Sequence, residues 1–173
     1  MAKPIMAWVD KDLNPLSKLQ FSSEEGRVSA IVADTESVVA KVGITNNFTN
    51  GTATETAVMD ATDCKLKVTD SEGTTNSPVV KERWIHAKCT TNGDGAYTQL
   101  GLDNETEVTI NVSAGDPTRP NTISGAANDG SITGTGQYNV AKIDLMAKPD
   151  LNTEATGGLQ SFRFVLIYSY GAA

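Results

Sequence analysis

Apolar and polar residues alternate with a period of two along much of the chain, and no long window carries apolar residues at helical spacing. Side chains of a β-strand point alternately to its two faces, so this alternation predicts half-buried strands joined by turns. The stretch 38–45 is the clearest example, since Val38, Ala40, Val42 and Ile44 are predicted to face inward while Lys41 and Thr45 are predicted to face water. Clusters of Gly, Asn and Asp between such stretches are typical of turns.

The same alternation predicts several further strands. The stretch 78–89 is interpreted as one long strand, and 108–112 as a shorter one. About eight to ten strands in one chain, joined by long loops, favour an all-β fold in which antiparallel sheets pack as a β-sandwich. The residues predicted to face its core include Cys64, Leu66, Val68, Ile85, Ala87, Cys89, Val108, Ile110, Val112, Ala141, Ile143 and Leu145.

The last strand pattern, residues 159–170, is apolar on both alternating faces. One face carries aromatic residues and Leu166, and the other carries Val165 and Ile167. Both faces need cover, so the strand is expected either at the centre of a sandwich or against a neighbouring subunit. Phe164 and Leu166 are expected to anchor the fold, and truncating either one to alanine would cost roughly 2–5 kcal/mol if it is fully buried.

Length and composition fit one β-sandwich domain, residues 1–173, because 39% of the 173 residues are apolar. Residues 114–136 are rich in Gly, Asn, Asp, Ser, Thr and Pro, which predicts a long exposed loop. The net charge of -7 and the scattered cations argue against nucleic acid, since phosphate binding needs clustered Lys and Arg. No apolar run has the length of a membrane span or a signal sequence, so no membrane partner is predicted.

The candidate reactive residues form no recognisable catalytic set. His86 is the one histidine, and without a nucleophile or acid nearby in sequence it is interpreted as a solvated or hydrogen-bonded strand residue. Cys89 follows it by three positions, which on a strand places the two side chains on opposite faces and argues against a metal pair. Cys64 and Cys89 are predicted to be buried free thiols. No catalytic residue, cofactor-binding residue or metal ligand is predicted, and the chain is expected not to be an enzyme.

Acidic residues gather in two runs, at 60–72 and at 103–107. Neither run has the ligand spacing of an EF-hand, and isolated carboxylates at turns explain both. No cofactor is therefore predicted. A calcium ion bound by loop oxygens is left as an open alternative.

Aromatic residues are the candidates for contacts with other proteins. Phe162, Tyr168, Tyr170, Trp8 and Trp84 are the interface candidates, with packing in the core as the alternative for each. Exposed aromatics beside polar loops also suit sugars, so Trp84 is the main candidate for a glycan platform.

Several pieces of the chain, taken in order, resemble a family of small virion proteins of tailed phages and prophages of Gram-positive bacteria, found in the tail, the baseplate or on the particle surface. The resemblance covers most of the chain, although its motifs are loose and specify no chemistry. Residues 114–136 have no place in it. The pieces are LSKLQF at 16–21, ITNN at 44–47, VMDATDCKLKV at 58–68, RWIHAK at 83–88, AYTQLG at 96–101 and FRFVLIYSY at 162–170.

The resemblance implies an Ig-like sandwich used as an assembly part. The expected function is that of a non-enzymatic structural protein in a phage or phage-derived particle, in capsid decoration or in the tail or baseplate. Expected partners are further copies of the chain and other virion proteins, and the expected location is the host cytoplasm and then the particle. A carbohydrate-binding module that attaches to a cell-surface glycan is the alternative. The spacing of Cys64, Trp84 and Cys89 is not that of antibody domains, so no disulfide between sheets is implied.

Overall fold

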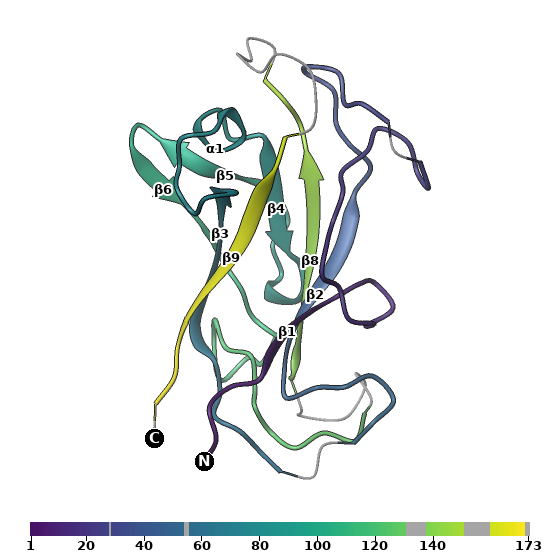
Figure 1. Cartoon of the computed structure of the whole chain (residues 1–173). Coiled ribbons are helices and arrows are strands. Elements are labelled where there is room, and N and C mark those ends of the chain that lie inside the picture. The colour runs from purple at the N-terminus through teal and green to yellow at the C-terminus, as the bar shows by residue number, and fades with distance from the viewer. Residues whose placement is uncertain (28, 54–55, 131–137, 151–159, 172–173) are drawn as a thin grey trace.

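The computed structural model describes residues 1–27, 29–53, 56–130, 138–150 and 160–171. In these ranges the chain forms nine β-strands, a short helix α1 (Pro78–Lys81) and a 3-10 turn η1 (Thr90–Asn92), as Figure 1 shows. No helix in the described ranges is long and apolar enough to cross a membrane. The strands are β1 (Met6–Val9), β2 (Ala40–Asn46), β3 (Thr62–Asp70), β4 (Ile85–Cys89), β5 (Thr98–Asp103), β6 (Thr106–Val108), β7 (Ile110–Asn111), β8 (Val140–Ala147) and β9 (Phe162–Ser169).

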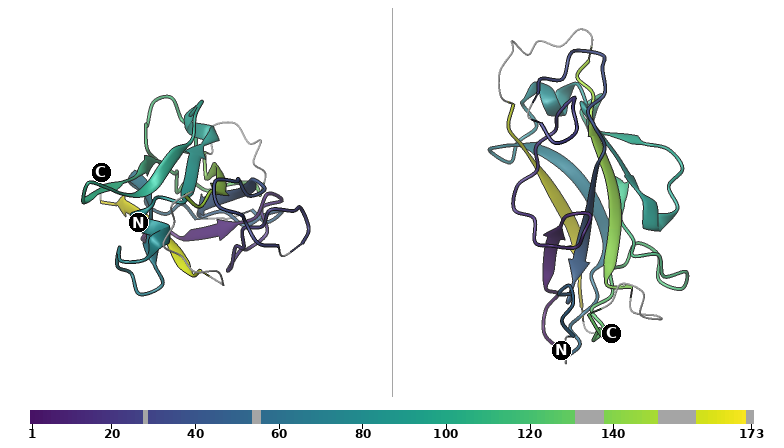
Figure 2. Two further views of the ribbon diagram at one scale, coloured as in Figure 1. Left: turned by 90° about the horizontal axis from the view of Figure 1, so that it is seen from above. Right: turned by 90° about the vertical axis from the view of Figure 1, so that its right-hand side faces the viewer.

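The strands form two antiparallel sheets. The larger sheet has the strand order β1-β2-β8-β4-β5-β6, and the smaller has the order β7-β3-β9. In Figure 1 the diagonal strands β3 and β9 lie in front of the larger sheet, and the right-hand view of Figure 2 shows β9 and β8 in separate layers. The prediction of an all-β fold built from antiparallel sheets in a sandwich is confirmed.

The core lies between the two sheets. Strands β4 and β8 contribute Ile85 and Ile143 from one side, and β3 contributes Leu66 from the other. The predicted strand 108–112 crosses between the sheets, because Val108 ends β6 in the larger sheet and Ile110 begins β7 in the smaller one. The alternation rule nevertheless found the buried positions Cys64, Leu66, Val68, Ile85, Ala87, Cys89, Ile110, Val112, Ala141, Ile143 and Leu145.

Strand β2 departs from the alternation at both ends. It begins at Ala40, so Val38 and Val39 lie outside the sheet and are exposed, and the prediction that Val38 faces inward is wrong. At its other end Thr45 is fully buried, so the prediction that Thr45 faces water is wrong. The strand lies between β1 and β8, and the Thr45 hydroxyl donates to the carbonyl of Ala7 at 3.4 Å, which gives the buried polar group a partner.

The predicted long strand at 78–89 is a helical turn followed by a strand. Pro78 stands in the first turn of α1, where its missing N–H costs no hydrogen bond. Val79 and Val80 are both buried. Neighbouring residues of a half-buried strand point to opposite faces, so a helical turn is what allows both valines to enter the core. Strand β4 then begins at Ile85.

Residues 114–130, predicted to be an exposed loop, lie largely against the end of the sandwich. Ile123 is fully buried, and its backbone exchanges two hydrogen bonds with Ala61, at 2.9 and 3.0 Å. A Cβ atom at Gly125 would clash with backbone carbonyl oxygens, so the close approach of the loop requires glycine there. The prediction of an exposed loop is therefore wrong for this part, and residues 131–136 lie outside the described residues.

Buried asparagine side chains hold this loop in place. The Nδ2 of Asn46, in the last position of β2, donates to the carbonyls of Met59 and Ile123 at 3.0 and 3.1 Å. The Nδ2 of Asn139, beside the start of β8, donates to the carbonyl of Ser124 at 2.9 Å. These bonds supply the partners that buried loop carbonyls need. We call the group the asparagine clamp, and it consists of Asn46, Asn47, Asn128 and Asn139.

A charged tie fixes the outer part of the same loop. Arg119 donates from Nη1 to Asp60 Oδ2 and from Nε to Asp116 Oδ2, both at 2.7 Å. The backbone N–H and hydroxyl of Thr118 donate to Asp116 Oδ1, at 2.9 and 2.7 Å. These bonds from Thr118, together with Arg119, lower the pKa of Asp116 to about 2. The loop is thus held by ion pairs as well as by the hydrogen bonds of the asparagine side chains.

Candidate interaction site at strand β9

Strand β9 forms one edge of the smaller sheet. It pairs with β3 along one side, and within the described ranges no strand pairs with its other side. The expectation of a central strand is therefore wrong, and contact with a neighbouring subunit stays a prediction. Phe164 and Leu166 are only half-buried. The cost of roughly 2–5 kcal/mol for truncating either one to alanine is expected only for a fully buried side chain, so it does not apply.

On the outer face of the smaller sheet, β9 carries the apolar residues Val165 and Ile167, and the neighbouring strand β3 carries two lysines. Val165 lies beside Lys67 of β3, and Ile167 lies beside Lys65. The Ile167 side chain is 43% exposed. Lys67 Nζ makes an ion pair with Glu107 Oε1 at 2.9 Å. The free edge is therefore bordered by two β-branched side chains, the exposed Ile167 and the half-buried Val165.

The inner face of β9 joins a cluster of four aromatic rings. Phe162 and Phe164 lie 5.4 Å apart between ring centroids, in an edge-to-face arrangement. Phe21 stacks on Phe162 at 5.8 Å, and Trp8 lies 6.1 Å from Phe164. These spacings are those of favourable aromatic pairs. Two of the interface candidates, Phe162 and Trp8, thus belong to one cluster, in which they pack within the chain.

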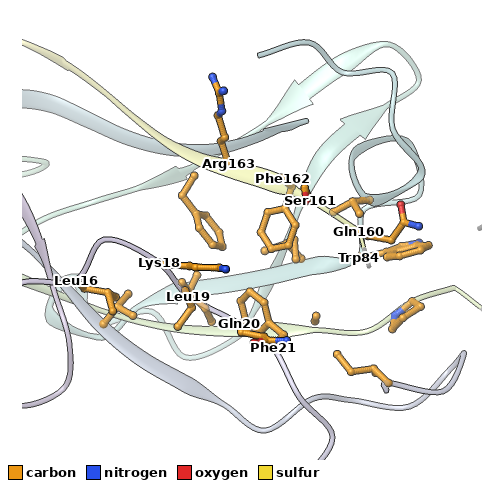
Figure 3. A pocket seen from close by; sticks show the side chains of 18 of the residues that line it. Leu16, Lys18, Leu19, Gln20, Phe21, Trp84, Gln160, Ser161, Phe162 and Arg163 are labelled. Carbon is orange, nitrogen blue, oxygen red and sulfur yellow. The ribbon is translucent and has the colours of Figure 1, made fainter. Parts of the chain in front are cut away.

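A cavity of about 720 Å³ lies beside this cluster. Figure 3 shows Leu19 and Phe21 on one side and Phe162 on the other, with Trp84 toward one end, while Arg163 points away. Its volume is in the range of ligand pockets, roughly 300–1,000 Å³. Because Phe162 and Phe164 belong to β9, the same strand lines the cavity with its inner face and forms the free edge of the smaller sheet.

The tyrosine candidates lie at the other end of β9. The rings of Tyr168 and Tyr170 are 6.2 Å apart, and the ammonium group of Lys3 lies 5.8 Å from the Tyr170 ring centroid. Tyr170 is 43% exposed, whereas Tyr168 is half-buried. Tyr170 is therefore the candidate with the most surface available to a partner.

Trp84 lies apart from the other candidates. Its side chain is 7% exposed in the wall of the cavity, and its Nε1 donates to Glu82 Oε2 at 2.8 Å. A sugar platform needs an open aromatic face. The position of Trp84 gives the glycan prediction no support at this residue.

The histidine and the two cysteines, which were the candidate reactive residues, have no catalytic arrangement in the described chain. His86 Nε2 and Gln99 Nε2 are 3.2 Å apart, and burial, with Lys148 nearby, lowers the pKa of His86. Cys64 and Cys89 are both buried free thiols, as predicted, and burial raises the pKa of Cys64 to about 12. Among the described residues, no group of three His, Cys, Asp or Glu side chains is placed to hold a metal ion.

The first acidic run contains a turn-forming carboxylate, whereas Asp103 and Glu107 of the second run form ion pairs with Arg83 and Lys67. Asp70 Oδ1 accepts from the backbone N–H groups of Glu72 and Thr74, at 3.0 and 2.7 Å. Asp70 Oδ2 accepts from the Thr74 hydroxyl, and these bonds lower the pKa of Asp70. This geometry is that of a carboxylate that closes a turn.

Leu19 and Phe21 lie at this site without having been predicted there. Both come from the long connection between β1 and β2, where no sustained alternation marks a strand. Their spacing of two residues puts both side chains on one side of an extended segment, and that signal was available in the sequence. Their contact with β9 joins residues far apart in the chain, which local patterns do not reveal.

The fold and this site define an all-β, sandwich-like protein with an open edge strand. Compared with known proteins, the chain matches no family model, no curated protein and no solved structure. The geometry of β9 and the resemblance in sequence to small virion proteins are therefore the observations that bear on its function.

Proposed function

We propose that the chain is a non-enzymatic structural protein of a phage or phage-derived particle, in capsid decoration or in the tail or baseplate, that acts through repeated protein–protein contacts. The observation that carries this proposal is the open edge of β9. An exposed edge presents a row of unpaired backbone N–H and C=O groups, which is a template for pairing with another chain. Ile167 and Tyr170 add exposed apolar surface at that edge.

Assignment to a particle rests on the ordered resemblance to small virion proteins. A particle presents the same surface many times, so contacts of modest strength act together at high effective concentration. One eight-residue strand edge is a small contact by itself. Repetition makes a contact of that size sufficient for stable attachment.

The test is to ask whether the chain belongs to purified particles. Particles from cells that encode the chain are separated on a density gradient, and the chain is quantified by mass spectrometry in every fraction, with an abundant cytoplasmic protein as control. We expect the chain to migrate with capsid or tail proteins in many copies. If it stays with the cytoplasmic control at the top of the gradient, the proposal is wrong.

The glycan-binding alternative has no specific observation in its favour, because its main candidate, Trp84, is buried. Binding of the purified chain to cell-wall glycan, lost in a Tyr170→Ala variant and retained in a Trp84→Phe variant, would restore that alternative through a different aromatic residue.

A further inference from the structure

We infer that two copies of this chain pair through their β9 strands, antiparallel, about a two-fold axis at Leu166. This inference rests on the proposed function and names the partner of the same site, a second copy of the chain. It joins the two smaller sheets into one continuous sheet with the strand order β7-β3-β9-β9-β3-β7.

The edge of β9 lacks most of the features that prevent edge pairing, and the one register shift in its pairing with β3 lies at its end, between Thr62 and Lys65. Edge strands of proteins that stay apart are short, bulged, interrupted by proline or protected by several charges. Strand β9 has eight residues without proline, and its register with β3 runs without a shift from Lys65 to Asp70. Its one charged residue is Arg163.

The position of the axis follows from the two faces of the strand. Side chains that face the core in one copy must face the same side of the continuous sheet in the other, so an inner residue has to lie opposite an inner residue. An axis through Leu166 satisfies this requirement. It also engages the whole stretch 162–170, because both ends of that stretch are equally far from Leu166.

The sequence of β9 is complementary to itself in this register. On the inner face, Phe164 meets Tyr168 of the second copy and Phe162 meets Tyr170 of the second copy. Aromatic pairs directly across two strands are among the favourable cross-strand pairs. The partner's tyrosine rings therefore come to lie beside the aromatic cluster and the adjoining cavity, where they cover apolar surface that each chain leaves open.

The outer face is complementary as well. Val165 meets Ile167 of the second copy, which covers the exposed Ile167 side chain of both chains. Arg163 meets Ser169 of the second copy, so neither guanidinium group faces a like charge. Moving the axis toward Arg163 brings the two guanidinium groups together, which disfavours those registers.

Charge favours this edge over the rest of the surface for contact between copies. Two chains of net charge -7 repel each other. Residues 160–171 contain no Asp or Glu, so the strands meet where neither copy presents a carboxylate on the pairing strand.

The first experiment is sedimentation velocity of the full chain over a concentration series, with Ile167→Lys and Val39→Lys as matched variants. Ile167 is 43% exposed on β9, and Val39 is 38% exposed before β2. In the dimer, Ile167→Lys places a lysine diagonal to its own symmetry mate and to Arg163 of the other copy. We expect the native chain and Val39→Lys to dimerise and the dissociation constant of Ile167→Lys to rise at least ~100-fold. The new lysine lies beside Lys65 of β3, so a small loss of monomer stability is expected as well, and the variants are compared at a temperature where each monomer is folded.

A cysteine cross-linking experiment tests the register. Three samples are oxidised: Val165→Cys alone, Ile167→Cys alone and an equal mixture of the two. Disulfide-linked dimers are then measured on non-reducing gels. The native cysteines are buried, so the introduced thiols are the accessible ones. We expect efficient cross-linking only in the mixture, because residue 165 of one copy lies opposite residue 167 of the other. Equal cross-linking in the separate samples, or none in any sample, overturns the register.

The outcomes separate this inference from the proposed function. A native chain that is monomeric at all concentrations, or an Ile167→Lys variant that dimerises like Val39→Lys, overturns pairing between copies. If such a monomer still enters purified particles, the proposed function stands while the second copy is the wrong partner. A dimer that is absent from particles supports the pairing and contradicts the proposed function.

Discussion

The loop at 114–130 and the strand β9 differ in a way that reverses what their compositions suggest. The loop is polar and rich in Gly and Pro, yet Ile123 and Ser124 within it are almost fully buried. The strand is apolar and aromatic, yet no residue of β9 is fully buried. Composition therefore does not decide which segment enters the core of this fold. The supply of partners for the backbone decides it.

In the loop, buried backbone groups have hydrogen-bond partners. The asparagine clamp and the tie through Arg119 reach the loop from β2, β8 and the segment before β3. Buried backbone groups without partners cost about 1–3 kcal/mol each, so these side chains are what allow a polar segment to be buried. Strand β9 has the opposite balance, because its side chains favour burial while one edge of its backbone lacks a partner in the described chain.

Removing the clamp should have the largest effect on stability. Asn46→Ala deletes two donors to the carbonyls of Met59 and Ile123 and the acceptor for the N–H of Ile5. We expect a loss of roughly 3 kcal/mol or more in the free energy of unfolding, measured in urea, because the Met59 carbonyl and the N–H of Ile5 lose the partner that Asn46 supplies and the Ile123 carbonyl keeps only the N–H of Ala61.

Asn50→Ala is the matched control for the clamp. Asn50 is exposed and donates to the carbonyl of Asp12 at 2.9 Å. Its loss should change the free energy of unfolding by less than ~1 kcal/mol. Equal losses for Asn46→Ala and Asn50→Ala would contradict the importance of the clamp.

Two isoleucine truncations compare the loop and the strand directly. Ile123→Ala in the buried loop should cost roughly 2–5 kcal/mol, as expected for a fully buried side chain. Ile167→Ala on the exposed face of β9 should cost less than ~1 kcal/mol in the monomer. Both are measured by chemical denaturation at a concentration where the chain is monomeric. A larger cost at Ile167 would show that β9, and not the loop, holds the core.

The charged tie predicts a smaller, pH-dependent effect. The pKa of Asp116 is about 2 in the folded chain, below its ordinary value of 3.8, so the folded state binds this proton less readily than the unfolded state. The resulting stability is fully present above about pH 4 and is lost as the pH falls toward 2. Asp116→Asn should therefore flatten the decline of unfolding free energy over that window. An unchanged slope would mean that Asp116 does not link folding to pH.

The sequence predicted those parts of the fold that depend on local alternation. Ala141, Ile143 and Leu145 face the core because β8 is an unbroken strand with one buried face. The buried loop was missed because its partners come from distant positions. Asn46 and Ile123, for example, are 77 residues apart in the chain.

At the candidate site, the sequence predicted the strand β9 but not the arrangement around it. The pattern of β9 correctly indicated a strand, whereas its place at the edge depends on β3, which pairs with it from about 100 residues earlier in the chain. Trp84 follows the helical turn α1, and its backbone N–H donates to the carbonyl of Val79 at 3.0 Å, so its buried position goes with that turn. The two-residue alternation of apolar and polar positions predicts neither the edge position of β9 nor the burial of Trp84.

Amide hydrogen exchange over a concentration series tests the central claim most directly, namely that β9 is the segment through which copies of this chain associate. Amides of residues 160–171 and of residues 121–128 are followed in the same sample. The account predicts that protection in 160–171 rises with protein concentration, because the free edge gains a partner, while protection in 121–128 is high and constant. Protection in 160–171 that does not change with concentration, although the chain associates in the same samples, would contradict it.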